Sequence, residues 1–261
     1  MISNETNSSQ GYLLTSVKNA LRLLNSFSID APDKKVTELA TTLGLGKSTV
    51  SRLLATLASE GFVTKDNVSK KYRLGLSILN LNSVVTSRLE VNREMRTILQ
   101  RLVYEIGETA HIAVLEGLSV VYINRVECKR PIHSLSHIGR RNPVHCTSSG
   151  KVILANQDEE IIRYFIDNGL SKYTVHTITD PVQFRNTLQI IKKQGYSISI
   201  EELHEGITSI AAPIRDHTGK VLYAISVIGP AHRMNINDKC IINKIKRAAE
   251  EISECLGYIK I

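Results

Sequence analysis

One stretch constrains this chain more than any other: the segment from Thr37 to Arg52, which reads TELATTLGLGKSTVSR. It begins inside a short apolar stripe of helical spacing made by Val36, Leu39, Ala40 and Leu43, and this stripe stops at two glycines. A second helix is expected from Lys47 to about Glu60, with Gly61 as its C-cap. A short helix, a glycine turn and a longer helix predict a helix-turn-helix, whose second helix enters the DNA major groove.

The second helix has two different faces. Its apolar face collects Val50, Leu53, Leu54, Leu57 and Ala58, whereas the opposite face is small and hydroxylated and carries one arginine. An arginine can pair with guanine through two hydrogen bonds, and hydroxyl groups serve phosphates or bases. The residues expected to reach DNA are Lys47, Ser48, Thr49, Ser51 and Arg52. The alternative is a three-helix packing unit with a solvated face.

The flanking segments favour the DNA interpretation. Helical spacing of apolar residues runs from Val17 to Phe27, and β-like stretches follow at Phe62–Lys65 and Lys71–Leu74. Three helices and a hairpin predict a winged helix-turn-helix. We assign wing contacts with phosphates or the minor groove to Lys70, Lys71, Tyr72 and Arg73, beside Lys65; the alternative is a charged, exposed hairpin. Between residues 12 and 73 the chain has ten Lys and Arg against five Asp and Glu, which suits a polyanionic partner.

The same stretch holds a misleading motif. Gly46-Lys47-Ser48-Thr49 resembles the end of a phosphate-binding loop, G-x-x-x-x-G-K-[ST]. The first glycine of that motif would fall on Thr41, and an amphipathic helix, not a strand, precedes it. We therefore expect no nucleotide site here.

The remainder of the chain predicts a linker and a second domain. Residues 76–106 read as helical, with Leu74, Ile78, Leu81 and Val85 spaced as in an inter-domain or dimer-forming helix. A hairpin is expected for Thr109–Glu116 and Ser119–Val126 about Gly117-Leu118. Further strand-like runs are Gly195–Ile200, Ser209–Ile214 and Val221–Ile228, and they alternate with helical segments at Gly150–Ala155, Asp158–Asp167, Pro181–Gln194 and Asn237–Leu256. This alternation predicts an α+β domain with a central antiparallel sheet.

Composition places the chain in a reducing compartment. Its 261 residues include four scattered cysteines without CxxC spacing, so neither a disulfide framework nor a zinc knuckle is indicated. The polar start has no signal-peptide pattern, and no apolar run approaches the ~18 residues that span a membrane. We expect a cytoplasmic protein without membrane contact, cofactor or metal. Zinc ligands could come from His111, His133, His137, His145 and Cys146, but packed or exposed histidines are the favoured interpretation.

The sequence resembles the IclR family of transcription regulators over nearly its whole length, about Leu14 to Gly257. The resemblance is carried by the N-terminal stretch, by Tyr72-Arg73-Leu74-Gly75 and by a series of C-terminal motifs: Gly107-Glu108-Thr109-Ala110-His111, Val120-Val121-Tyr122, His145-Cys146-Thr147 through Gly150-Lys151, Gly195-Tyr196, Glu201-Glu202, Gly206 followed by Ala211-Ala212-Pro213, and Ser226 through Gly229-Pro230. It implies a winged helix DNA-binding domain, a GAF-like effector domain, and dimers or tetramers that bind operators. The domains would be a disordered lead at 1–11, the winged domain at 12–75, a linker helix at 76–90 and the effector domain at 91–261.

The resemblance also implies an effector pocket. Carried over position by position, it would comprise Ser134, Asn142, Ser148, Ser149, Gly150, Ile207, Ser209 and Ser226, with Glu201 and Glu202 nearby. Thr147 to Lys151 also looks like a helix start, where free N–H groups attract anions; the alternative is that Thr147 or Ser148 only caps that helix. Serines at 148 and 149 replace small or apolar residues of the family, and Ser209 a common cysteine. A pocket rich in hydroxyl groups suits a sugar acid better than an aromatic ligand.

Three classes of function compete. The first is a ligand-responsive DNA-binding regulator, and we expect a repressor of a catabolic operon whose effector is a small polar metabolite such as an organic or sugar acid. Its partners would be double-stranded operator DNA, the effector and further copies of the chain. The second is an enzyme using Glu201, Glu202, His204 and His145 as acid–base groups, but no nucleophile–base spacing supports it. The third is an architectural DNA-binding protein whose second domain only oligomerises.

Overall fold

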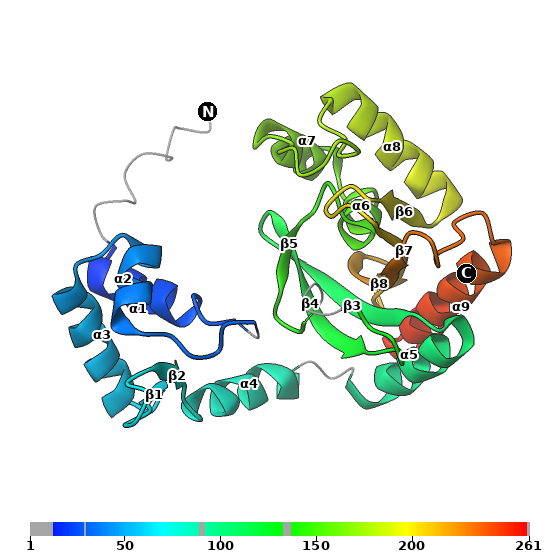
Figure 1. Ribbon diagram of the computed structural model, residues 1–261. Coiled ribbons are helices and arrows are strands. Elements are labelled where there is room, and N and C mark those ends of the chain that lie inside the picture. Colours follow the sequence, from blue (N-terminus) through cyan, green and yellow to red (C-terminus); the bar gives the residue numbers. More distant parts are fainter. Residues whose placement is uncertain (1–12, 29, 89–91, 133–136, 260–261) are drawn as a thin grey trace. The chain divides into compact units, whose positions relative to one another are not determined.

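The computed structural model describes residues 13–28, 30–88, 92–132 and 137–259, shown in Figure 1. It divides into two compact units, residues 1–90 and residues 91–261. The predicted disordered lead at 1–11 and the predicted pocket residue Ser134 lie outside the described residues. No described helix has both the length and the apolar character needed to cross a membrane.

The first unit is a winged helix-turn-helix. It contains α1 (Thr15–Leu24), α2 (Val36–Leu43), α3 (Lys47–Ser59), β1 (Val63–Lys65), β2 (Tyr72–Leu74) and α4 (Ser77–Arg88). Strands β1 and β2 pair antiparallel, as predicted for the wing. Gly44 ends α2 in the left-handed region at φ 67°, where a residue without Cβ carries no steric cost. The core of this unit consists of Leu23, Leu39, Ala40, Leu43, Val50, Leu54, Val63 and Tyr72.

A close backbone contact joins α3, the wing and α4. The amide of Gly75 donates to the carbonyl of Phe62 at 2.8 Å. A Cβ on Gly75 would lie 2.0 Å from the carbonyl oxygen of Gly61, so only glycine fits there. The hydroxyl of Ser77 donates to the carbonyl of Glu60 at 3.0 Å. The first turn of α4 is therefore fixed to the residues that end the recognition helix.

The predicted helical region 76–106 consists of two helices with different surroundings. In α4, Leu79, Leu81, Val84 and Val85 are exposed. In α5 (Asn92–Ile106), by contrast, the apolar side chains are buried in the core of the second unit: Met95, Ile98, Leu99, Leu102 and Val103. The prediction of one joining region therefore needs correction. The apolar face of α5 is buried in the second unit, whereas the apolar side chains of α4 are exposed.

The second unit is built on one antiparallel sheet, as predicted, and this sheet has six strands. Its strands are β3 (Thr109–Glu116), β4 (Ser119–Val126), β5 (Arg141–Pro143), β6 (Ser197–Ile200), β7 (Ile207–Arg215) and β8 (Val221–Pro230). Their order across the sheet is β5-β4-β3-β8-β7-β6. The β3–β4 hairpin turns at Gly117, whose φ is 56°. Strand β5 was not predicted; it adds three residues to the edge of β4.

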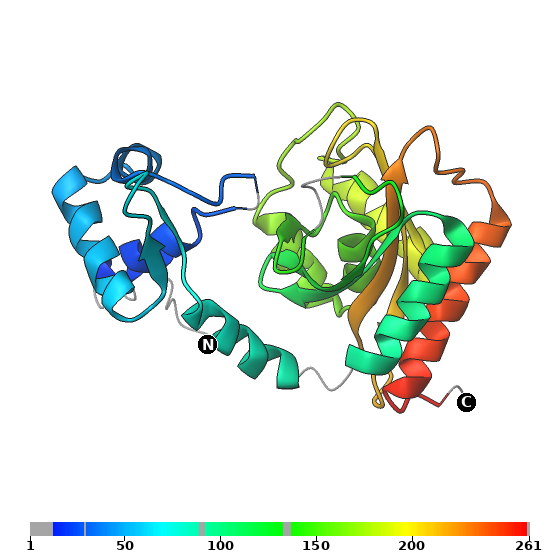
Figure 2. The same cartoon turned by 60° about the horizontal axis from the view of Figure 1, so that its bottom comes forward.

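Helices cover both faces of this sheet (Figure 2). Helices α5 and α9 (Lys239–Cys255) pack side by side on one face, around a core that includes Leu99, Ile112, Ile225 and Ile245. The other face carries α6 (Ser148–Leu154), α7 (Glu159–Asp167) and α8 (Pro181–Gln194) over a second core. Asp180 and Asp238 cap α8 and α9, accepting from the amides of Gln183 and Cys240.

Candidate nucleic-acid interface and effector cavity

The outer face of α3 carries the predicted DNA-contacting side chains. Val50 and Leu54 are fully buried, while Leu53 and Leu57 are partly buried and anchor the helix in the winged unit. Ala58, which was predicted to be apolar-facing, is exposed, because α3 reaches its last turn there. All five predicted contact residues are exposed: Lys47, Ser48, Thr49, Ser51 and Arg52. This face offers two cations and three hydroxyl groups to a partner.

The wing presents cations around a buried tyrosine. Lys65, Lys70 and Arg73 are exposed and Lys71 is partly so. Tyr72 is only 7% exposed: its ring packs in the core beneath the Lys65 ammonium, 5.6 Å from the ring centroid. The prediction that Tyr72 contacts DNA is therefore corrected. Alternation along β2 turns its ring inward and the neighbouring Arg73 outward, so Tyr72 supports the wing from inside.

A small cavity of about 30 Å³ lies between α6, the β4–β5 edge and β7 in the second unit. Its lining is neutral and rich in hydrogen-bonding groups: Tyr122, Asn142, Cys146, Thr147, Ser199, Leu203, His204, Ile207, Ser209 and Ile228. A larger surface groove of about 360 Å³ lies between β7 and α9, bordered by Arg215, Lys246 and Glu254. None of the predicted effector residues lines that groove, whereas several line the small cavity.

The structure brings some predicted effector residues to the cavity and not others. Asn142, Ile207 and Ser209 line it, and Ser148 donates its hydroxyl to Ser209 at 2.8 Å. Three further predicted residues do not line it. Ser149 is buried in α6, and Ser226 is buried on β8 opposite His111. Gly150 is a packing residue, because a Cβ there would lie 2.2 Å from the carbonyl oxygen of Val144.

The start of α6 is capped by its own side chain. Thr147 Oγ1 accepts from the amide of Gly150 at 3.2 Å and donates to the carbonyl of Pro143 at 3.0 Å. One of the free amides at this helix start is thus already satisfied inside the chain. Of the two alternatives left open by the sequence, the geometry favours the cap.

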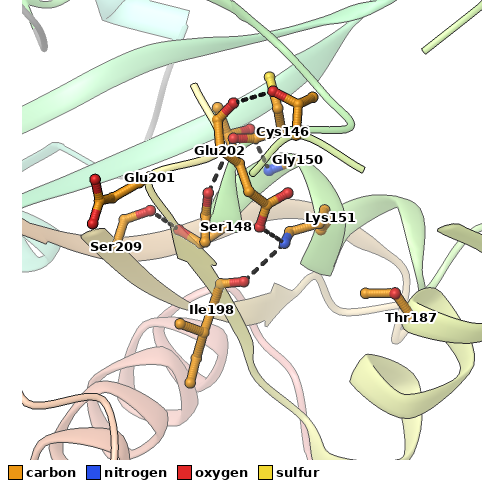
Figure 3. Close-up of polar contacts among 12 residues, drawn as sticks. Cys146, Ser148, Gly150, Lys151, Thr187, Ile198, Glu201, Glu202 and Ser209 are labelled. Carbon is orange, nitrogen blue, oxygen red and sulfur yellow. Dashed lines mark hydrogen bonds and ion pairs between the residues drawn. The ribbon is translucent and has the colours of Figure 1, made fainter. Parts of the chain in front are cut away.

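A buried ion pair connects α6 with the turn that follows β6 (Figure 3). The Lys151 ammonium lies between the Glu202 carboxylate and the carbonyl of Ile198, which it contacts at 2.8 Å. The side chain of Lys151 is 2% exposed and that of Glu202 7%. The second carboxylate oxygen of Glu202 has no hydrogen-bond partner among the described residues. A charge buried this deeply is tolerable only when it is paired, so the two residues depend on each other.

The turn at residues 201–206 is fixed from several sides. Thr174 and Thr177 donate their hydroxyls to the carbonyls of Glu201 and Glu202 at 2.7 and 2.6 Å. The carboxylate of Glu201, a residue at φ 55°, accepts from the amide of Gly206 at 2.7 Å. These bonds, together with the Lys151–Glu202 pair, present Leu203 and His204 to the cavity.

The adjacent His145 and Cys146 do not form a nucleophile and its base. Nε2 of His145 contacts the carbonyl oxygen of Ser171 at 2.9 Å, and burial lowers the pKa of this histidine. Burial, aided by the charge of Glu202, raises the pKa of the Cys146 thiol to about 12. A protonated thiol is a poor nucleophile. The described residues contain no cluster of three or more His, Cys, Asp and Glu that could hold a metal, and His133 lies outside them.

The sequence missed most of this cavity. Seven of its ten lining residues were not predicted as effector residues: Tyr122, Cys146, Thr147, Ser199, Leu203, His204 and Ile228. Tyr122 and Cys146 belong to motifs that carry the family resemblance, so these motifs could have indicated that both residues line the cavity. Ser199, Leu203 and His204 come from β6 and the turn after it, and nothing in their spacing marks them as lining a cavity.

Curated relatives cover nearly the whole chain. The HTH-type transcriptional regulator XynR of Escherichia coli K12 is 30% identical over 250 residues, which span 94% of this chain and 98% of XynR. The HTH-type transcriptional repressor AllR of Salmonella typhimurium is 30% identical over 245 residues, covering 92% of this chain and 89% of AllR. Both alignments include the winged unit and the effector unit together.

Solved structures share the same fold. The crystal structure of Thermotoga maritima IclR aligns with a TM-score of 0.76 at 29% identity, over 94% of this chain and 99% of that one. An IclR homologue from Microbacterium hydrocarbonoxydans, crystallised with 4-hydroxybenzoate, aligns with a TM-score of 0.80 at 24% identity, over 92% and 98%.

Two family matches account for both units. Residues 16–67 match the IclR helix-turn-helix domain, and residues 83–254 match the bacterial transcriptional regulator IclR C-terminal domain. The fold, the exposed recognition helix and the relatives agree with this assignment, and they place the chain among regulators instead of enzymes. The chain therefore belongs to the IclR family of DNA-binding transcription regulators.

Proposed function

We propose that this chain is a ligand-responsive repressor of a catabolic operon, acting in the cytoplasm, with a small organic or sugar acid as effector. The observation that carries the proposal is the pairing of an exposed hydroxyl-rich, basic helix in one unit with a polar cavity in the other. Two relatives support its parts: AllR bears the name of a repressor, and the Microbacterium homologue was crystallised with a small acid.

DNA contact in this proposal is made by α3 and the wing. Arg52, one turn into α3, is the side chain suited to read a guanine, with Ser48 and Ser51 beside it. Lys47, Thr49, Lys70, Lys71 and Arg73 hold the phosphates. Tyr72 stays inside the winged unit and acts on DNA only by holding the wing in place.

The proposal includes a dimer whose partner is a second copy of the chain. One helix buries too little surface for tight specific binding, so two half-sites must be read together. The winged unit offers apolar faces for this: Leu14, Val17 and Leu21 along α1, and Leu79, Leu81, Val84 and Val85 on α4, are all more than half exposed. Self-complementary apolar faces suit a two-fold pair.

Sedimentation velocity tests the dimer. We expect a dimer or a dimer of dimers for the full chain. Leu81→Lys should shift it towards monomer and weaken specific DNA binding, whereas Leu118→Lys, an equally simple change at an exposed leucine of the second unit, should do neither. A monomer that binds its operator specifically would refute the dimer.

The repressor function is tested by selection followed by titration. Duplexes that the full chain selects from a random pool should contain two half-sites, and a bound three- to six-carbon hydroxy acid should change their affinity roughly 5- to 150-fold. Ser209→Leu should fill the cavity and abolish this response, and Ser171→Leu, at an exposed serine, should preserve it. Unchanged operator affinity with every acid tested would disprove ligand-responsive repression.

A further inference from the structure

The groove between β7 and α9 lies where one edge of the sheet steps back. Strand β6 begins at Ser197, opposite Ala211 of β7, so the next residues of β7 run past the start of β6. Helix α9 packs against β7 there, and two of the side chains between them, Ala212 and Ala249, are small and buried. The groove has a volume of about 360 Å³, against about 30 Å³ for the small cavity. This size lies within the range of small-molecule sites.

Arg215, the last residue of β7, is fixed at one end of the groove. Its guanidinium donates to the carbonyl of Gly219 at 3.0 Å and to the side-chain oxygen of Asn156 at 3.3 Å. Its backbone amide donates to the hydroxyl of Ser253 at 2.9 Å, and its guanidinium lies 6.0 Å from the centroid of the Tyr258 ring. All of these partners are neutral. The guanidinium is therefore held in place with its charge intact, which suits an arginine that binds a carboxylate.

Glu254 supplies the opposite charge at the same end of the groove. It follows Ser253, the residue that the amide of Arg215 contacts, and lies exposed in the last turn of α9. No ion pair within the described part of the chain includes Arg215 or Glu254. The carbonyl end of a helix carries partial negative charge, which adds to the attraction of this carboxylate for a cation. An unpaired cation and an unpaired carboxylate thus border one end of the groove.

The floor of the groove is apolar. Ala212 and Ala249 are buried in it, and Pro213 beside them has no backbone N–H to donate to a ligand. Lys246 and Glu250 border the groove farther along α9. More than two turns of helix, about 12 Å, separate Lys246 from the charged end. That length leaves room for an apolar side chain to lie along the floor.

We propose that this groove is a second ligand site, which binds an apolar α-amino acid. Arg215 takes the carboxylate, Glu254 takes the ammonium group, and the side chain lies over the apolar floor. Guanidinium groups bind carboxylates through paired, charge-assisted hydrogen bonds. An α-amino acid carries both charges on one carbon, which neither a simple acid nor a simple amine does. The site goes beyond the proposed function, because it shares no lining residue with the small cavity.

The test separates the two charges of the ligand. Calorimetric titration of the full chain would use valine, leucine, methionine and phenylalanine. Leucine would be compared with isocaproate, which lacks the ammonium group, and with isoamylamine, which lacks the carboxylate. Hydrocinnamate and phenethylamine are the matching compounds for phenylalanine. The same titrations would be made on Arg215→Gln, Arg215→Lys and Glu254→Gln, with melting temperatures to report on the folding of each variant.

The two groove variants should have different effects. In the parent, at least one of these amino acids should bind roughly tenfold or more tightly than the acid or the amine that matches it. Arg215→Gln should lower the affinity of the amino acid to that of its matching amine, and Glu254→Gln should lower it to that of its matching acid. Arg215→Lys, which keeps the charge and loses the paired geometry, should retain part of the affinity.

Two control variants change charges outside the groove. Arg247→Gln removes a cation of α9 that is paired with Glu251 at 3.1 Å. Glu160→Gln removes an exposed carboxylate of α7, which lies on the opposite face of the sheet. Both should bind the amino acid as the parent does.

Four results would overturn the inference. They are no binding by any of the four amino acids, binding of the acid or the amine as tight as that of the amino acid, groove variants that bind as the controls do, and equal weakening of all three ligands in both groove variants. The last result would show that Arg215 and Glu254 have only a structural role. None of these results touches ligand-responsive repression, which is measured with hydroxy acids on operator affinity.

Discussion

The winged unit and the effector unit place their working residues in opposite settings. In the winged unit the side chains expected to meet DNA lie on the outside of one helix, and the core beneath them is a separate set of residues. In the effector unit the side chains of the candidate site lie inside the fold: Asn142, Thr147 and Ser199 are buried, and Ser148 is hydrogen-bonded to Ser209. Function and stability should therefore be separable by mutation in the first unit and inseparable in the second.

The largest effect should come from Lys151→Met. It leaves the Glu202 carboxylate buried without its cation, which costs about 3–5 kcal/mol of unfolding free energy. Hydrogen exchange resolved along the chain should show the loss in residues 91–261 and leave the winged unit unchanged.

Two variants control for this result. The double change Lys151→Met with Glu202→Leu should recover most of the loss, since removing both charges leaves neither unpaired. Lys172→Met, at an exposed lysine, should stay within about 0.5 kcal/mol. A Lys151→Met protein as stable as the parent would show that the pair contributes little to the effector unit.

Gly75→Ala should destabilise the winged unit in the same selective way. Its Cβ would meet the carbonyl oxygen of Gly61 at 2.0 Å, and backbone must move to admit it. We expect a loss of about 1–3 kcal/mol, confined to residues 1–90. Gly46→Ala, where the nearest atom is 3.9 Å away, should cost less than about 1 kcal/mol. Equal effects of the two alanines in denaturant titrations would contradict the close contact.

Arg52→Ala should separate function from stability. Because the side chain is exposed, unfolding free energy should change by no more than about 0.5 kcal/mol. Discrimination at one base pair of the operator should fall by ~1–3 kcal/mol, measured by fluorescence anisotropy on single-base variants. Lys71→Ala should weaken all duplexes alike and reduce the salt slope by about one. If the Arg52→Ala protein discriminates between base pairs as well as the parent does, Arg52 does not read the base assigned to it.

The smallest effect is a pH dependence at Cys146. The folded thiol has a pKa of about 12 and the unfolded one 9.0, so above pH 9 the unfolded chain ionises first and stability falls. This group should cost about 1.4 kcal/mol by pH 10. Cys146→Ala should lose less stability between pH 8 and 10 than the parent, whereas Cys240→Ala, at an exposed cysteine, should match the parent. Identical pH profiles for all three would rule out a buried protonated thiol.

The contrast between the units also explains what the sequence could predict. Helix α3 was predicted with both faces because periodicity alone decides which side chains of a surface helix are exposed. Tyr72 was misassigned because basic neighbours outweighed the inward alternation of a three-residue strand. Strand β5 was missed because Arg141–Pro143 is too short to show alternation.

The cavity was predicted only in part for a different reason. Lys151 and Glu202 are 51 residues apart in the chain, and Ser148 and Ser209 are 61 apart. Such contacts exist only because strands β6 and β7 place those residues beside α6. The resemblance supplied Asn142, Ile207 and Ser209, but Leu203 and His204 depend on the path of the turn after β6, which no local pattern records.

Reciprocal titration tests most directly the central claim that the two units are coupled. Effector affinity would be measured with and without saturating operator duplex, and operator affinity with and without saturating effector. Our account predicts that the two ratios are equal and lie between roughly 5 and 150, because a coupling free energy acts equally in both directions. An effector that binds with the same affinity whether or not the operator is bound would contradict it.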